Sequence, residues 1–156
     1  EMYFRPLAFD YPADTHAAQV EDQLMVGGSI MIAPVYRQNA TGRYVYLPQD
    51  MLMVRMKSLE DRTCKVMEQG HHYVDIALNE VVIFVKKNHM LPVAVLDEDV
   101  KNISGVVAGR YEWIGFAEDA AEYVLYEDDG VSKKYTPQEN WKKIVMTREE
   151  LGMAVC

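Results

Sequence analysis

The apolar residues of this chain occur in short runs, and this spacing constrains the fold more than any other feature. The runs are rich in Val, Ile, Tyr and Phe and are separated by Gly, Pro, Asn and Asp. Branched and aromatic side chains suit the pleated surface of a sheet, and the intervening residues are typical of turns. The pattern therefore predicts an all-β protein. The expected strands are residues 3–9, 29–36, 43–47, 51–56, 72–77, 81–86, 90–95, 106–116, 123–127, 131–135 and 141–146.

Three segments between these strands have the composition of hairpin turns. The first is 38–42, where Asn39 and Gly42 can adopt left-handed backbone angles. The second is 87–89, with Asn88 expected at positive φ. The third is 128–130, which ends in an Asp-Gly pair. Consecutive hairpins of this kind predict antiparallel sheets.

One segment has the periodicity of a helix. Between residues 15 and 25 the apolar side chains of Ala17, Ala18, Val20, Leu24 and Met25 fall on one helical face, and the glycine pair at 27–28 can end a helix. We therefore expect one short helix there. Near the end of the chain, residues 136–139 have the form of a helix-start capping box, followed by a strand-like run.

An acidic break at residues 96–99 divides the chain into two expected units. Residues 1–95 form the larger unit and residues 96–156 the smaller one. With 156 residues, of which 49% are hydrophobic, the chain is long enough to bury a core. No long Gly, Ser or Pro linker joins the units, so we expect them to pack together.

The formal net charge of −8 argues against nucleic acid or an anionic membrane surface as a partner. A neutral ligand such as a sugar is compatible with it. No run approaches the ~20 apolar residues of a membrane helix. The two cysteines, Cys64 and Cys156, lie far apart in sequence, which favours unreactive thiols in a reducing compartment. The expected location is therefore the cytoplasm.

Several groups of polar residues resemble functional sites, but their spacing does not fit. Residues 127–130 are acidic, yet an EF-hand frame around Gly130 places Leu125 and Thr136 at carboxylate positions. Neighbouring His71 and His72 would point to opposite faces of a strand. The remaining rejected candidates are His16 and His89 as metal ligands, Ser29 as a nucleophile, residues 27–28 as a phosphate loop, and Asn39 and Asn102 as glycosylation sites. The sequence therefore predicts no catalytic, substrate-binding or metal-ligating residue, and no cofactor.

Aromatic residues on the expected strands leave a second interpretation open. Such rings can stack on the apolar face of a pyranose, although core packing and cross-strand pairing are commoner roles. The candidates are Tyr44, Tyr46, Tyr73, Trp113, Tyr123 and Tyr126. Exposed coplanar rings would favour sugar binding, and burial in the core would argue against it.

Four segments, taken in order, resemble the region that follows the catalytic barrel in glycoside hydrolase family 31. Residues 5–12 (RPLAFDYP) are similar to the family's RPL-x-F-x-(F/Y)-P run, and residues 22–35 (DQLMVGGSIMIAPV) to its DQ…APV run, which RYVYLP follows at 43–48. Residues 80–92 (EVVIFVKKNHMLP) are similar to its P-x-F-V-R-x-G-x-x-x-P hairpin. Residues 125–130 (LYEDDG) are a weaker match. The likeness to bacterial α-glucosidases of the gut Firmicutes type is particularly close.

The resemblance implies an antiparallel β-sandwich, the proximal C-terminal domain, followed by a smaller distal β domain. It further implies a missing (β/α)8 catalytic barrel of the same chain as partner, and an α-glucoside as substrate of the parent enzyme only. In this retaining family two barrel aspartates act as nucleophile and general acid/base. Both precede Glu1, so no catalytic residue is assigned to this chain.

Two positions depart from the family pattern. Residues 51–57 (MLMVRMK) stand where the family has W-x-D-x-x-(T/S)-G, and Asn88 stands where its hairpin has glycine. Neither departure changes the assignment. Two functions are thus weighed: a noncatalytic scaffold of an α-glucosidase that hydrolyses terminal α-linked glucose, and, as the alternative, a carbohydrate-binding β-sandwich module.

Overall fold

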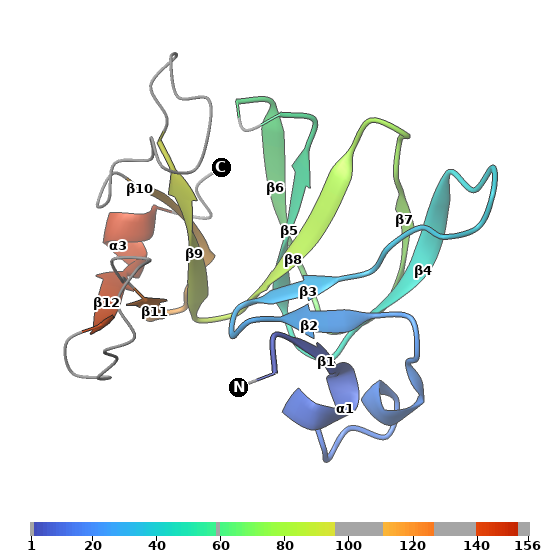
Figure 1. Cartoon of the computed structure of the whole chain (residues 1–156), viewed down its shortest axis with the longest axis horizontal. Helices are drawn as coiled ribbons and strands as arrows, with labels where there is room; N and C mark the ends of the chain where they lie inside the picture. Colours follow the sequence, from blue (N-terminus) through green and yellow to red (C-terminus); the bar gives the residue numbers. More distant parts are fainter. Residues whose placement is uncertain (1, 59, 96–110, 127–139, 153–156) are drawn as a thin grey trace.

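The computed structural model describes residues 2–58, 60–95, 111–126 and 140–152. In this part of the chain most residues lie in antiparallel strands, which confirms the all-β expectation (Figure 1). The helical segments are α1 (Leu7–Asp10), the 3-10 turn η1 (Ala17–Gln19) and α3 (Arg148–Leu151). No helix in these ranges is long and apolar enough to cross a membrane.

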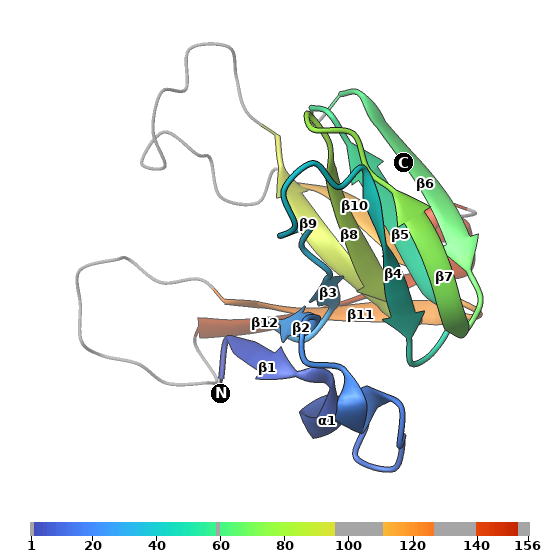
Figure 2. The ribbon, with the colours of Figure 1, turned by 90° about the vertical axis from the view of Figure 1, so that its right-hand side faces the viewer.

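The strands form three sheets. The first has the spatial order β1 (Phe4–Pro6), β2 (Leu24–Val26), β3 (Ile30–Ile32), β8 (Val81–Lys86), β5 (Met51–Met56) and β6 (Arg62–Met67). The second pairs β4 (Gly42–Leu47) with β7 (Gly70–Asp75). The third has the order β10 (Tyr111–Phe116), β9 (His89–Ala94), β11 (Ala120–Tyr126) and β12 (Trp141–Thr147). Figure 2 shows β11 and β12 running across the direction of β5 and β8.

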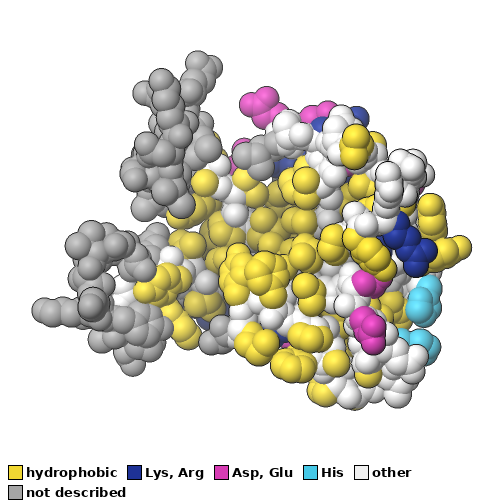
Figure 3. Space-filling model, turned by 45° about the vertical axis from the view of Figure 1, so that its right-hand side comes forward, with side chains coloured by type: hydrophobic (Ala, Val, Ile, Leu, Met, Phe, Trp, Pro, Cys, Tyr) yellow, Lys and Arg dark blue, Asp and Glu magenta, His cyan; other side chains and the backbone are white. Residues whose placement is uncertain are grey.

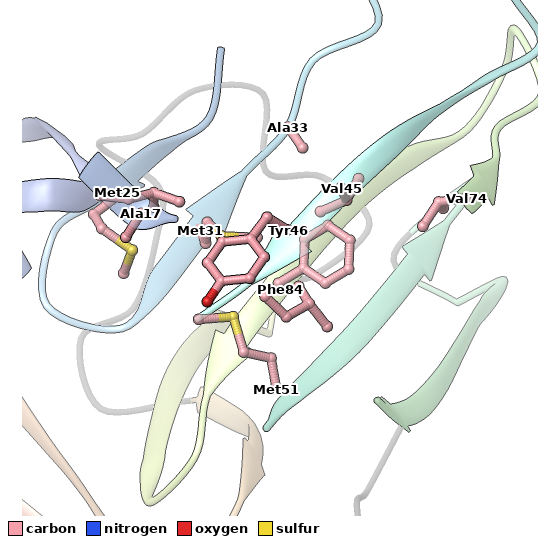
Figure 4. Packing of buried hydrophobic residues seen from close by; sticks show 11 residues of the cluster. Ala17, Met25, Met31, Ala33, Val45, Tyr46, Met51, Val74 and Phe84 are labelled. Atoms are coloured by element: carbon pink, nitrogen blue, oxygen red, sulfur yellow. The ribbon is translucent and has the colours of Figure 1, made fainter. Parts of the chain in front are cut away.

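A first core lies between the six-stranded sheet and the β4–β7 pair (Figure 4). Met31, Met51 and Phe84 enter it from the larger sheet, and Val45 and Val74 from the pair. All five side chains are buried. These two layers form the sandwich that the sequence predicts.

The opposite face of the six-stranded sheet is buried as well. Leu52, Val54 and Val85 pack there with Ile114 of β10, and partly buried side chains of β9 and β10 complete the cluster. Strands β5 and β8 therefore send alternate residues into two different cores, which explains their nearly continuous apolar sequences. This second core confirms that the four-stranded sheet packs against the rest of the chain.

A third cluster covers the far side of the four-stranded sheet. Met90, Ala117 and Ala121 are buried there with Leu151 of α3. Helix α3 is fixed by a capping box, in which the Thr147 side chain accepts from the Glu150 backbone N–H and the Glu150 carboxylate accepts from the Thr147 backbone N–H.

Two of the expected hairpins are wrong, although their turn residues behave as expected. Asn39 and Asn88 adopt φ values of 61° and 60°. However, 38–42 leads from β3 of the six-stranded sheet to β4 of the two-stranded one, and 87–89 leads from β8 to β9 of the four-stranded sheet. Both turns carry the chain between layers. The third expected hairpin, at 128–130, lies outside the described residues, as do strand 131–135 and the capping box at 136–139.

The expected helix over residues 15–25 is also wrong. Only Ala17–Gln19 is helical, and Leu24 and Met25 begin strand β2. Gly27 adopts φ 57° in the turn between β2 and β3 rather than ending a helix. The expected strand 3–9 is replaced by the short β1 and α1. Tertiary contacts override the local periodicity at both places.

Two further findings concern Cys64 and the expected boundary at residue 95. Cys64 is disulfide-bonded, so the expectation of an unreactive thiol is wrong at this position; Cys156 lies outside the described residues. The division into residues 1–95 and 96–156 stays a prediction. Strand β9 nevertheless pairs with β10 and β11, so the four-stranded sheet begins before residue 95.

Candidate functional site

The start of the chain presents an apolar surface. Met2, Tyr3 and Phe4 precede or begin β1, and Phe9 lies on α1; each is more than half exposed. We call these four residues the N-terminal apolar face. Strand β1 is the edge of its sheet, so one side of it has no neighbouring strand within this sheet. Exposed apolar groups on an edge are typical of a contact surface.

The Arg5 side chain anchors the segments that carry the N-terminal apolar face. Its guanidinium donates from Nε to Asp10 Oδ1 at 2.7 Å and from Nη2 to Asp10 Oδ2 at 2.9 Å. It also donates to the Gly27 carbonyl at 2.8 Å and to the Met2 carbonyl at 2.9 Å. One buried side chain thus joins β1, α1 and the β2–β3 turn.

The Asp10 carboxylate is held ionised by this arrangement. Its hydrogen bonds from Arg5 lower its pKa below the usual range, and the Lys86 ammonium at 3.7 Å acts in the same direction. The N-terminal apolar face therefore rests on a firmly paired polar layer. This layer holds the backbone of β1 and α1, which carry Phe4 and Phe9, in one arrangement.

Gln23 links the two layers of the sandwich beneath this region. Its side-chain amide donates to the Tyr46 carbonyl at 2.7 Å and accepts from the Tyr46 backbone N–H at 2.8 Å. Gln23 and Tyr46 are both buried. The glutamine thereby completes the backbone hydrogen bonding of β4, which a neighbouring strand would otherwise supply.

The Tyr46 side chain gathers two histidines that lie far apart in the sequence. Its ring centroid lies 4.8 Å from that of His71 and 5.5 Å from that of His16. Its hydroxyl donates to Asp14 Oδ2 at 2.6 Å, and burial together with this bond raises the tyrosine pKa. Sequence spacing alone could not bring His16 and His71 together. Among the described residues, however, no group of three or more His, Cys, Asp or Glu side chains is placed to hold a metal ion.

The outer side of the β4–β7 pair carries exposed tyrosines. Tyr44 and Tyr73 are 74% and 57% exposed and lie directly opposite each other across the two strands. Their ring centroids are 5.1 Å apart and the ring planes meet at 73°. The rings are therefore exposed, as sugar binding requires, but they are not coplanar.

The other aromatic candidates lie elsewhere. Tyr46 is buried, and Trp113 and Tyr123 pack against the third core. Tyr126, on β11, is about half exposed. Of the six candidates, only Tyr44 and Tyr73 therefore lie on the outer side of the sandwich.

The carboxyl groups with clearly shifted pKa values are unsuited to act as a general acid. Asp10, Asp14, Glu80, Glu122 and Glu150 all have pKa values below the usual range, because each accepts hydrogen bonds from side chains or backbone N–H groups. A general acid in a glycosidase needs a raised pKa to keep its proton. The prediction that this chain carries no catalytic residue remains a prediction, and these five groups agree with it.

The other residues rejected from the sequence occupy structural positions. Ser29 is buried after the β2–β3 turn. His72 bonds the Glu68 carbonyl and His89 the Lys87 carbonyl. The acidic run at 127–130 and residues 97–99 lie outside the described residues.

Comparison with known proteins gives a consistent family. The glycosyl hydrolase family 31 C-terminal domain matches residues 1–91. Alpha-glucosidase 2 of Bacillus thermoamyloliquefaciens is 29% identical over 135 residues, which are 84% of this chain and 16% of that protein. Neutral alpha-glucosidase AB of Mus musculus is 31% identical over 94 residues, 56% of this chain and 9% of that protein.

A solved structure extends the likeness to nearly the whole chain. The Flavobacterium johnsoniae GH31 dextranase superposes with a TM-score of 0.68 and 24% identity, covering 93% of this chain and 17% of that one. At this identity the likeness shows the fold alone. The chain spans less than a fifth of the length of each of these relatives.

Proposed function

Because this chain belongs to glycoside hydrolase family 31, as part of the C-terminal domain, we propose that it is the noncatalytic scaffold of a retaining α-glucosidase. The parent enzyme would hydrolyse terminal α-linked glucose from oligosaccharides in its (β/α)8 barrel. Two of the relatives are named as α-glucosidases, which supports this substrate class over the dextran that the solved neighbour cleaves.

The observation that carries the proposal is the N-terminal apolar face. Met2, Tyr3, Phe4 and Phe9 are exposed in this chain, whereas Arg5 and Leu7, which alternate with them, are buried. A folded protein rarely leaves several large apolar side chains together in water. The barrel of the parent enzyme precedes this region in the family, so the barrel is the proposed occupant.

The proposed role is to support the barrel structurally. Burying one aromatic side chain stabilises a contact by roughly 1.5–3 kcal/mol. The Arg5–Asp10 pair beneath the face is already formed, so little ordering accompanies docking. The chain would thereby cover apolar surface of the barrel and hold its loops in position, while the barrel aspartates perform the chemistry.

Charged substitutions on this face test the proposal. In the longer protein, Phe4→Asp and Phe9→Asp should each lower the thermal midpoint and shorten the half-life of activity at elevated temperature, because each would bury a carboxylate against the barrel. In this chain alone, the same changes should leave the free energy of unfolding nearly unchanged, because both rings are exposed there.

Leu78→Asp is the matched control. Leu78 is fully exposed in the connection between β7 and β8, away from the N-terminal apolar face. We expect its aspartate variant to behave like the unaltered longer protein. If Phe4→Asp and Phe9→Asp are indistinguishable from Leu78→Asp in the longer protein, this face is not the contact and the proposal fails.

A further inference from the structure

Three exposed tyrosines surround a hollow on the outer side of the β4–β7 pair. Tyr36 lies in the connection before β4, and Tyr44 and Tyr73 lie on the two strands; all three are more than half exposed. The hollow has a volume of about 330 Å³, and its lining also includes Asp22, Pro34, Arg37 and Arg43. We call it the tyrosine hollow. Figure 3, which turns the β4–β7 side of the molecule forward, shows extensive hydrophobic surface with charged groups scattered over it.

The two strand tyrosines are held in place by their neighbours. Tyr73 lies directly opposite Tyr44, with the rings in edge contact. A Cβ on Gly42 would lie 2.9 Å from the Tyr73 hydroxyl oxygen and 2.5 Å from the Val74 carbonyl oxygen. The missing side chain at position 42 therefore leaves room for the Tyr73 ring. The edge contact between the two rings and the space above Gly42 favour this arrangement of the tyrosines in the free chain.

The floor of the hollow is polar and contains an ion pair. Arg43 pairs with Asp22 at 2.6 Å and donates to the Pro34 carbonyl at 2.7 Å. The Tyr36 hydroxyl donates to the same Asp22 carboxylate at 3.3 Å. The Asp22 side chain remains 41% exposed, and a carboxylate has acceptor capacity beyond these two bonds. The hollow thus offers Asp22 as an acceptor for hydroxyl groups, and the Arg43 and Arg37 guanidinium groups line it as well.

We propose that the tyrosine hollow binds a neutral oligosaccharide through one or two pyranose rings. A pyranose combines an apolar face, which a tyrosine ring can cover, with hydroxyl groups, which Asp22 and the tyrosine hydroxyls can bond. Arg43 is paired with Asp22, and the net charge of −8 of the chain opposes an anionic ligand, although Arg37 also lines the hollow. The volume suits a ligand of this size. The choice of α-glucosides rests on the proposed function.

Nitration of tyrosines tests the proposal on the unaltered protein. Tetranitromethane should nitrate Tyr3, Tyr44 and Tyr73 of this chain, with the sites located by peptide mass spectrometry. Adding isomaltotriose or maltotriose at about ten times Kd should slow nitration of Tyr44 and Tyr73 about tenfold, because mass action leaves roughly a tenth of the sites free. Tyr3, outside the hollow, should react at an unchanged rate.

The same measurement on the longer protein separates this proposal from the scaffold proposal. There Tyr3 should be protected without sugar if the barrel covers the N-terminal apolar face, while Tyr44 and Tyr73 should still react until sugar is added. Protection of Tyr44 and Tyr73 without sugar would mean that another part of the protein covers the hollow, and would overturn the present proposal alone. An unprotected Tyr3 would count against the scaffold proposal alone.

Substitutions give a second test by calorimetric titration with the same two trisaccharides. Tyr44→Ala should weaken binding about tenfold, whereas Tyr44→Phe should retain most of the affinity because it keeps the ring. Tyr3→Ala is the matched control and should bind as the unaltered chain does. Circular dichroism melting confirms that each variant is folded. Unchanged affinity in folded Tyr44→Ala, or absence of both heat and nitration protection in the unaltered chain, would overturn the proposal.

Discussion

The hydroxyl groups of Tyr11 and Tyr46 are both buried, but they differ in their hydrogen bonding. The Tyr46 hydroxyl donates to Asp14 at 2.6 Å, whereas the Tyr11 hydroxyl has no hydrogen-bond partner among the described residues. Burial raises the pKa of both phenols, and the Asp10 charge beside Tyr11 adds to the effect there. The same chemical group therefore stabilises the fold at one position and opposes it at the other.

Removing each hydroxyl should show this difference. Tyr46→Phe should lower the free energy of unfolding of the chain by about 1.5 kcal/mol, because it breaks a hydrogen bond to a carboxylate. Tyr11→Phe should leave it unchanged or raise it by up to about 1 kcal/mol, because a desolvated group without a partner disappears. Urea unfolding measures both. Equal losses in the two variants would contradict this assignment of hydrogen bonds.

The Arg5–Asp10 pair predicts a dependence of stability on pH. The pKa of Asp10 is lowered in the folded chain, so its contribution is present above the ordinary carboxyl pKa, 3.8, and is lost as the pH falls through the lower folded value. Asp10→Asn should therefore cost roughly 3 kcal/mol at pH 7, and this cost should shrink as the pH falls below 3.8, as measured by urea unfolding.

An exposed ion pair is the control for this effect. Glu122 and Lys143 also pair, but both side chains are more than half exposed. Glu122→Gln should cost much less than Asp10→Asn at pH 7, because solvent screens this exposed pair. A loss in Asp10→Asn at pH 7 that does not exceed the loss in Glu122→Gln would show that the Arg5–Asp10 pair does not stabilise the start of the chain.

At the scale of strands, close approach between β9 and β10 depends on one glycine. A Cβ on Gly115 would lie 2.7 Å from the Met90 Cβ and 3.0 Å from the His89 carbonyl oxygen. Gly115→Ala should therefore push the strands apart and cost about 1–3 kcal/mol in urea unfolding. Gly28→Ala is the matched change, because a Cβ there meets nothing within 4 Å; it should change stability by less than about 0.5 kcal/mol. A similar effect of both would contradict the close packing.

Strands with strong local signals could be predicted from the sequence, and those fixed by distant contacts could not. β5 and β8 occupy the expected residues because both their faces are buried and their sequences are continuously apolar. β2 was predicted as part of a helix, since periodicity cannot reveal that neighbouring Gln23 bonds the backbone of Tyr46. β6 was missed because Arg62, Thr63 and Lys65 interrupt its apolar pattern. Helix α3 was missed, although its capping residues, Thr147 and Glu150, can be recognised in the sequence.

The candidate surfaces show the same division. Tyr44 and Tyr73 were candidates for sugar contact in the sequence, but only the β4–β7 register places them opposite each other. The N-terminal apolar face could not be foreseen, because residues 3–9 were expected to form one strand. The break into β1 and α1 after Pro6 turns Phe9 outward and allows Arg5 to reach Asp10.

At the scale of the whole molecule, three sheets share two cores through β5 and β8. The turns at Asn39 and Asn88 could be predicted from the sequence. Whether such a turn joins two paired strands or crosses between sheets depends on the packing of the strands on both sides of it. The family assignment did not depend on these details. It follows from ordered sequence motifs and from the match over residues 1–91.

The central claim, that this chain supports catalysis without performing it, is tested most directly by hydrolysis of an aryl α-glucoside. The chain and the longer protein that contains it should be assayed side by side at equal molar concentration. We expect turnover by the longer protein and none by the chain alone. Turnover by the chain alone would contradict the claim and would place a catalytic pair within these 156 residues.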